Sequence, residues 1–213
     1  MRQFRKTLTI SAAAGAFKVV DANTCSGRQQ DLPMTTPAAK VWDMLRLIRH
    51  GGPALCNIAV TNACNARCDF CNFANGKVPH KDLRWIDAGR FDAALDILHA
   101  RGIRYVSFFG GEPLLHPRLP ELIATAVAKG MGAAIITNGW LLSSKLDELA
   151  AAGLRTVYVS IDAPVMADHE ANRGLKGLGA RIRSATARMA RPIISARNRT
   201  RYRAKALVFM SPL

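Results

Sequence analysis

The 213-residue chain has no long apolar run and few aromatic residues, and its last acidic residue is Glu170. No stretch approaches the roughly 20 consecutive apolar residues that span a bilayer, so we expect no membrane segment. Cysteine is absent after Cys71, which excludes a disulfide framework spread along the chain. Three of the five cysteines instead lie close together. This pattern favours a metal site and a reducing, cytoplasmic compartment.

Positive charge is concentrated at the two ends of the chain, whose formal net charge is +15. Residues 51–180 carry 13 basic and 12 acidic side chains, whereas residues 1–50 carry 8 and 3, and residues 181–213 carry 9 and none. Such ends can bind phosphate backbones non-specifically or simply be solvated. The nearly neutral middle favours solvated ends, so we do not expect a nucleic-acid partner. A nucleic-acid-binding module that depends on the basic ends is the alternative.

The periodicity of apolar residues divides the chain into four parts. Residues 1–33 lack a sustained period and are expected to form a disordered extension, with Met34 as an alternative start to Met1. Residues 34–54 are expected to form an N-terminal helix and a linker. Residues 55–180 form the predicted core, and residues 181–213 a basic irregular tail. Within that tail only two short runs are weak strand candidates, at 192–195 and 206–210.

Four predicted strands alternate with three predicted helices in the core. The strands are expected at 57–61, 105–109, 133–136 and 156–161. The helices are expected at 86–100, 119–128 and 143–152, with a possible fourth at 180–189. This alternation predicts an α/β fold with parallel strands and right-handed crossovers, arranged as a partial (β/α) TIM-type barrel with poorly defined C-terminal strands. Polar and glycine-rich residues follow the strands, at the edge where such folds carry their sites.

Cys64, Cys68 and Cys71 directly follow the first predicted strand, with the spacing C-x3-C-x2-C. Cysteine thiolates hold iron–sulfur clusters, and a cubane cluster contains four irons. Three protein ligands therefore leave one iron open to a ligand from outside the protein. A structural zinc loop is the alternative, with Cys56 or His80 as its fourth ligand. The surrounding motifs favour the cluster.

This loop resembles the signature of the radical S-adenosylmethionine (SAM) superfamily, with Phe70 in its aromatic position. The resemblance covers residues 55–180 and is nearest to the branch of the molybdenum-cofactor, nitrogenase-cofactor and pyrroloquinoline-quinone biosynthesis enzymes. It implies a [4Fe–4S] cluster on the three cysteines and SAM on the open iron. It further implies reductive cleavage of SAM to a 5′-deoxyadenosyl radical, an oxidoreductase-type reaction on an unknown small-molecule or peptide substrate. An electron donor such as flavodoxin or ferredoxin is also implied.

The same resemblance assigns contacts with SAM to residues at the ends of the later strands. Gly110, Gly111 and Glu112 are expected to receive the SAM amino group. Asn138 is expected to touch SAM or substrate, although the same residues also fit an ordinary turn. Ser160 and Asp162 are expected near the ribose and the carboxylate of SAM. Arg173 is expected to pair with that carboxylate because its fork matches a carboxylate, with a solvated surface position as the alternative. No side chain is assigned as catalytic.

The chain departs from the family pattern in two respects. It offers fewer convincing strands than the family barrel, and no cysteines for further clusters follow Cys71. The alternative to an active enzyme is therefore a truncated remnant that binds iron without turning over.

Overall fold

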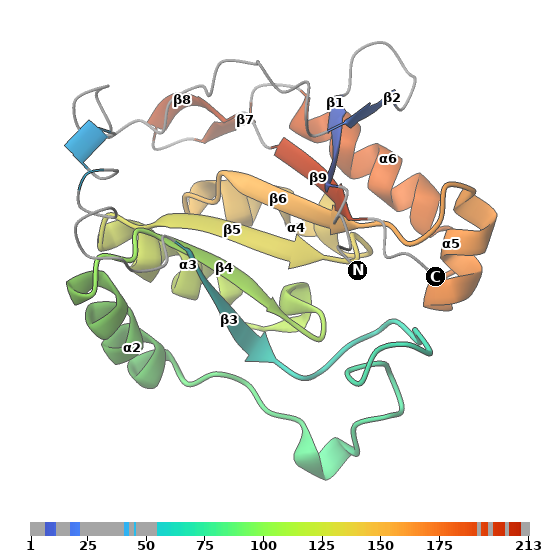
Figure 1. Cartoon of the computed structure of the whole chain (residues 1–213), viewed down its shortest axis with the longest axis horizontal. Coiled ribbons are helices and arrows are strands. Elements are labelled where there is room, and N and C mark those ends of the chain that lie inside the picture. Colours follow the sequence, from blue (N-terminus) through green and yellow to red (C-terminus); the bar gives the residue numbers. More distant parts are fainter. Residues whose placement is uncertain are drawn as a thin grey trace.

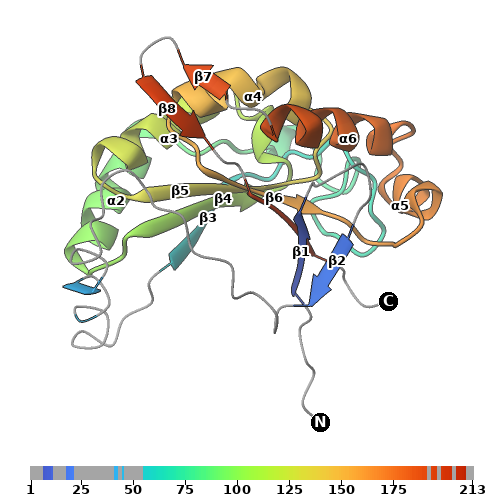
Figure 2. The same cartoon turned by 90° about the horizontal axis from the view of Figure 1, so that it is seen from above.

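The computed structural model describes residues 55–190, together with strand residues at 7–11, 18–21, 193–195, 198–202 and 205–209 and helical residues at 41, 42 and 45. A twisted sheet is covered on one face by helices, which Figure 2 shows as a layer above the strands. Among the residues that the structure describes, no helix has the length and apolarity needed to cross a membrane.

Four parallel strands form the centre of the sheet (Figure 1). They are β3 (Leu55–Thr61), β4 (Tyr105–Gly110), β5 (Gly132–Thr137) and β6 (Thr156–Ser160). Neighbouring strands pair in the order of the sequence, and every pair is parallel. The predicted α/β class and the four predicted strands are confirmed.

Helices connect these strands and cover one face of the sheet. The α-helices are α2 (Ala88–Ala100), α3 (Leu119–Ala128), α4 (Leu142–Ala151), α5 (Met166–Arg173) and α6 (Leu178–Met189). Two short 3-10 helices are η2 (His80–Asp82) and η3 (Pro113–Leu115). The predicted boundary at residue 180 cuts through α6 and is wrong. Although α6 lacks acidic residues, it buries Leu178, Ile182 and Met189 at helical spacing, so it belongs to the core.

Short strands from both ends of the chain extend the sheet beyond β6. β9 (Lys205–Phe209) pairs parallel with β6, and β1 (Thr7–Ser11) and β2 (Lys18–Asp21) follow as antiparallel neighbours. β7 (Ile193–Ser195) and β8 (Asn198–Tyr202) form a separate antiparallel pair. The two strand candidates of the tail, at 192–195 and 206–210, are confirmed as β7 and β9. The prediction of a structureless segment 1–33 is wrong at β1 and β2, and β8 was not predicted, because these strands are too short to show a clear period. The helix predicted in 34–54 falls outside the described residues except at 41, 42 and 45, which are helical.

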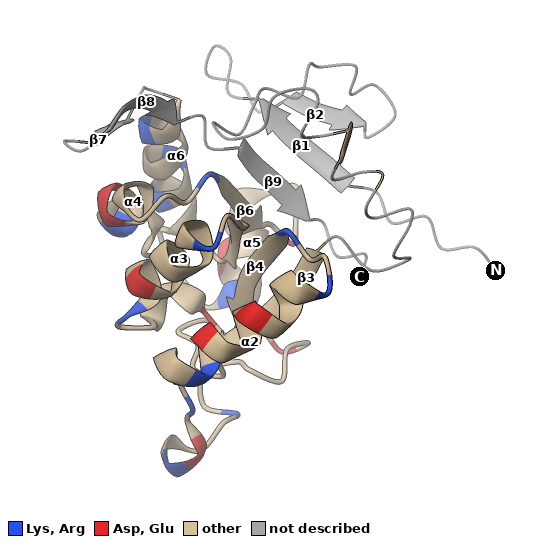
Figure 3. Cartoon of the chain, turned by 90° about the vertical axis from the view of Figure 1, so that its left-hand side faces the viewer, with Lys and Arg blue, Asp and Glu red and all other residues tan. Residues whose placement is uncertain are grey.

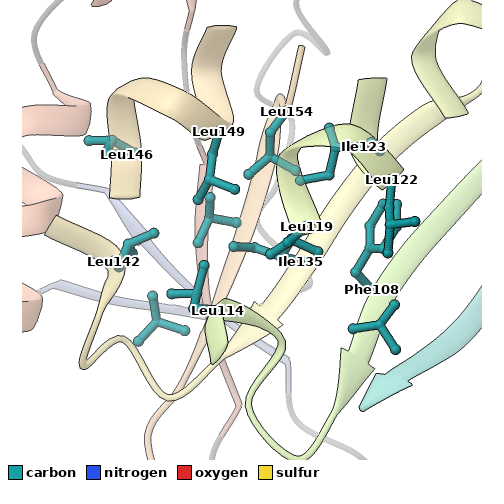
Figure 4. Close-up of a cluster of buried hydrophobic side chains, with 14 of the residues drawn as sticks. Phe108, Leu114, Leu119, Leu122, Ile123, Ile135, Leu142, Leu146, Leu149 and Leu154 are labelled. Atoms are coloured by element: carbon teal, nitrogen blue, oxygen red, sulfur yellow. The ribbon is translucent and has the colours of Figure 1, made fainter. Parts of the chain in front are cut away.

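The hydrophobic core lies between the sheet and the helices (Figure 4). Alternate strand residues face the same side of a sheet, and Val106, Phe108 and Ile135 are among those buried beneath the helices. Fully burying a side chain of this kind stabilises the fold by roughly 1.5–3 kcal/mol. Strands β3 to β6 contain no Lys, Arg, Asp or Glu. Figure 3 shows the charged residues on the helices and the loops instead.

Candidate functional site

The carboxyl ends of the four parallel strands meet at one edge of the sheet, where the arrowheads of β3 to β6 lie in Figure 1. The cysteine loop follows β3, and the Gly110–Gly111–Glu112 segment lies at the end of β4. Asn138 follows β5, and Asp162 follows β6. The structure therefore brings the predicted site segments together at a single edge.

Two glycines at the end of β4 hold the start of the cysteine loop. The Gly111 N–H donates to the Thr61 carbonyl at 2.8 Å, and the Glu112 N–H donates to the Ala63 carbonyl at 2.7 Å. A Cβ atom at Gly111 would overlap the backbone carbonyl of Ala63, and one at Gly110 would overlap that of Thr61. The lack of side chains at these glycines lets the backbone of the cysteine loop approach β4. Their expected contact with the SAM amino group stays a prediction.

The far end of the cysteine loop returns to the same place. Arg84 donates its N–H to the Asn62 side chain at 2.7 Å, and its carbonyl accepts from the Thr61 hydroxyl at 2.9 Å. Trp85 pairs antiparallel with Thr61, and the Ile86 N–H donates to the Val60 carbonyl at 2.9 Å. The segment between Asn62 and Arg84 is thus a loop whose two ends are joined by hydrogen bonds.

All three loop cysteines are free thiols. Cys68 is buried, and Cys64 and Cys71 are partly exposed. Burial raises the pKa of Cys64 to about 11, against a hydrogen bond that the Ala66 N–H donates to its sulfur at 3.4 Å. Burial also raises the pKa of Cys68, and the positive charge of Arg173 opposes that rise.

The donor set fits an iron–sulfur cluster, whose usual ligands are cysteine thiolates. Across residues 55–190 and the short described pieces, no three His, Cys, Asp or Glu side chains gather around a position for a single metal ion. In a cubane each thiolate binds a different iron atom, so the sulfur atoms surround the cluster and do not converge on one ion.

Glu112 connects the ends of β4 and β5. Its side chain is fully buried and accepts hydrogen bonds from the Leu114 N–H at 3.0 Å, the Thr137 hydroxyl at 2.6 Å and the Asn138 N–H at 2.8 Å. Burial raises the pKa of Glu112, and these three hydrogen bonds oppose the rise. The sequence placed this carboxylate against the SAM amino group. In the structure its oxygens bind protein donors.

Asn138 connects the end of β5 to the cysteine loop. It is buried, and its side-chain nitrogen donates to the Asn65 side-chain oxygen at 2.8 Å. Its own side-chain oxygen accepts from the Trp140 N–H at 2.9 Å. The turn is confirmed, and it holds Asn138 against Asn65, which follows Cys64 in the sequence. The contact of Asn138 with SAM or substrate stays a prediction.

Asp162 and Arg173 form a buried ion pair beyond the end of β6. The guanidinium Nε and Nη2 atoms each lie 2.6 Å from a different carboxylate oxygen. Burial disfavours the ionised carboxylate, but hydrogen bonds with His169 and Arg173 outweigh it and lower the pKa of Asp162. The alternative of a solvated surface position for Arg173 is wrong, because only 9% of the residue is exposed.

His169 is a member of this group that the sequence did not assign to the site. It is fully buried, and its Nδ1 lies 3.2 Å from the Asp162 backbone nitrogen and 3.5 Å from Asp162 Oδ2. Its Nε2 atom has no hydrogen-bond partner within the described part of the chain. The sequence feature that could have identified His169 is its position four residues before Arg173, because this spacing places both side chains on one face of α5.

The remaining two predicted site residues are more accessible. Phe70 is 54% exposed on the cysteine loop. Ser160 is the last residue of β6 and is partly exposed. Both lie at the same edge of the sheet as the cysteines and leave surface for a ligand.

Comparisons with known proteins agree with this arrangement. The family model for the radical SAM superfamily matches residues 58–184. A GTP 3′,8-cyclase of Chlorobaculum tepidum is 42% identical over 107 residues, which cover 49% of this chain and 32% of that protein. An AdoMet-dependent heme synthase of Nitratidesulfovibrio vulgaris is 31% identical over 135 residues, which cover 62% of this chain and 36% of that protein. The chain thus spans about a third of the length of these curated relatives.

Solved structures show the same fold at low sequence identity. SuiB of Streptococcus suis, bound to S-adenosylmethionine, superposes with a TM-score of 0.55 at 19% identity, covering 75% of this chain and 39% of that chain. Methylornithine synthase (PylB) gives 0.53 at 16% identity, covering 72% and 49%. Because the family model matches more than half of its residues, the protein belongs to the radical SAM superfamily.

Proposed function

We propose that this chain is the SAM-cleaving core of a radical SAM enzyme, with Cys64, Cys68 and Cys71 as the ligands of its [4Fe–4S] cluster. The observation that carries the proposal is the position of three free thiols on one hydrogen-bonded loop at the carboxyl edge of a parallel sheet. The superfamily uses this cluster together with SAM and a reductant.

When bound, the cluster supplies the electron that cleaves SAM into methionine and a 5′-deoxyadenosyl radical. The chain must first provide three thiolates, because the thiolate is the metal ligand. Burial raises the pKa of the Cys64 and Cys68 thiols, so iron must displace their protons against that shift as it binds. Arg173 assists ionisation of Cys68 through its positive charge.

The chain would also orient SAM at this edge. The partly exposed Gly110 and Gly111 suit the amino group, since their backbone is held next to the cysteine loop. Phe70, Ser160 and the Asn138 turn would complete the contacts. Glu112 acts from beneath by holding the ends of β4 and β5 together through its hydrogen bonds.

Residues 58–184, which match the family model, support the SAM chemistry common to the family and do not point to one substrate. The relatives that match this part of the chain include a GTP 3′,8-cyclase and a heme synthase, whose names give different reactions.

Anaerobic reconstitution with iron and sulfide tests the proposal. We expect about four irons per chain, a [4Fe–4S] electron paramagnetic resonance signal that SAM perturbs, and 5′-deoxyadenosine upon addition of a strong reductant. Cys68→Ala should lose the cluster, whereas Cys56→Ala is the matched control and should keep it, because Cys56 lies within β3 and outside the loop. One or two irons per chain in the wild type would contradict the proposal. A full cluster without 5′-deoxyadenosine would favour an inactive remnant.

A further inference from the structure

Arg173 contacts both the end of β6 and the cysteine loop. Its guanidinium binds Asp162 through two hydrogen bonds of 2.6 Å. Its backbone carbonyl accepts the Arg67 N–H at 2.8 Å, and Arg67 lies between Cys64 and Cys68. One residue at the end of α5 therefore connects the cysteine loop to the sheet.

Gly174 allows Arg67 to approach the end of α5 closely. Its φ of +60° is a left-handed conformation that ends α5, and a Cβ atom here would lie 3.1 Å from the Cβ of Arg67. Glycine at this position leaves room for the Arg67 side chain against the end of the helix. The loop is therefore in contact with α5 through both the backbone and a side chain.

The charges of the pair are poorly screened by solvent. The exposed fractions of the Asp162 and Arg173 side chains are 7% and 11%, and His169 beside them is fully buried. Both charges act on Cys68: Arg173 favours its ionised form and Asp162 opposes it. The carboxylate and the guanidinium thus form a compensated pair on the residue that binds Arg67, the neighbour of Cys68 in the sequence.

We infer that the Asp162–Arg173 pair is a positioning unit that holds the cysteine loop in place through the Arg67 contact and balances the charge beside the cluster. Asp162 occupies the Nε–Nη2 edge of the guanidinium. Through this pair and its backbone carbonyl, Arg173 acts on the cluster by way of the loop. This inference rests on the proposed function, because it concerns the cluster that the three cysteines would hold.

The charge balance predicts reduction potentials that move in opposite directions. Reduction adds a negative charge to the cluster, and nearby charge is one determinant of its potential. Arg173→Met leaves Asp162 uncompensated and should make the midpoint potential more negative. Asp162→Asn leaves Arg173 uncompensated and should make it more positive. The double variant should return close to the wild-type value. Redox titration followed by electron paramagnetic resonance measures the midpoint potentials of the wild type and the three variants.

The positioning role predicts a change in the metal-free protein as well. In the folded protein, an alkylating reagent reaches the buried Cys68 only when the loop opens locally. Because Arg173→Met should loosen the Arg67 contact, we expect the rate of Cys68 alkylation to rise by about tenfold. Arg173→Lys keeps the charge but loses the bidentate fork. It should therefore label fast while keeping a near wild-type potential. This variant also keeps the test decisive if Arg173→Met folds poorly.

A second arginine–carboxylate pair provides the control, in which one guanidinium nitrogen, Nη2, contacts both carboxylate oxygens. Arg188 of α6 lies 2.8 Å and 2.7 Å from the two carboxylate oxygens of Asp147 on α4. Arg188→Met should change neither the potential nor the labelling of Cys68. Potentials that shift in the same direction in both single variants, or not at all, would overturn the inference. Failure of the wild type itself to bind a four-iron cluster would instead refute the proposed function and remove the basis of the inference with it.

Discussion

On the helix-covered face of the sheet, Phe108 and Ile135 pack against leucines of the surrounding helices, and no polar partner is involved (Figure 4). At the carboxyl edge, Glu112 is as deeply buried and Asp162 is 8% exposed, but each is held by specific donors. Apolar packing tolerates substitutes of similar volume. A buried carboxylate tolerates none that lacks the same acceptors. Packing on the helix-covered face therefore contributes most to the stability of the fold, and the hydrogen bonds at the carboxyl edge determine where the site residues lie.

The largest effect is expected from Gly111→Ala. The added methyl would overlap the Ala63 carbonyl, which is backbone and has little room to move. The start of the cysteine loop should therefore leave β4, and iron binding should fall to background in reconstitution assays. Gly89→Ala is the control, because its new methyl would meet only the Asp87 side chain, at 3.3 Å. Full iron content in Gly111→Ala would show that the close approach of these two backbones is unnecessary.

A smaller effect is expected from Phe108→Ala on the helix-covered face. Phe108 is fully buried, and its ring lies 5.7 Å from that of Phe91. Removing it should lower the free energy of unfolding by about 3–5 kcal/mol, measured by urea denaturation. Below the new melting temperature the iron content per chain should remain that of the wild type. If Phe108→Ala lost its iron while keeping the helix content of the wild type, the core on the helix-covered face and the site at the carboxyl edge would not be independent.

The smallest effect on stability is expected from Glu112→Gln. An amide presents an N–H group where the carboxylate accepted a hydrogen bond, so at least one buried donor among Leu114, Thr137 and Asn138 loses its partner. Stability should fall by about 1–3 kcal/mol. Unlike Phe108→Ala, this variant should also alter the SAM-induced change in the cluster spectrum.

Glu148→Gln on the exposed side of α4 is the matched control for that variant. We expect it to leave both the unfolding curve and the spectrum unchanged. An identical result for Glu112→Gln would mean that the link between β4 and β5 is dispensable.

Much of the central sheet was predictable, because apolar periodicity and glycine positions are local signals. The same holds for the position of the site, since parallel strands bring their carboxyl ends together wherever they occur in the sequence. The pairing of polar residues was not predictable. Asn138 contacts Asn65 across 73 positions and Glu112 across 26, and no local pattern encodes such contacts.

Arg173 illustrates the same limit in a different way. The resemblance assigned it to the SAM carboxylate, which stays a prediction, and in the structure its guanidinium binds a carboxylate of the protein. The carboxylate is that of Asp162, 11 positions earlier in the chain, and the sequence pattern alone did not distinguish it from that of a ligand. β1 and β2 were missed because strands of five and four residues are too short for their alternation to stand out.

The hydrogen bonds between Arg84 and the Thr61–Asn62 segment have a consequence for how the protein acquires iron. Because they join the ends of the loop from Asn62 to Arg84, we expect the entropy of bringing these ends together to be lost on folding, before iron binds. Iron then meets a preorganised receptor, and little of its binding energy is spent on ordering the chain. Inserting residues into the loop between Cys71 and Arg84 should consequently weaken iron uptake far less than cutting the chain in that segment.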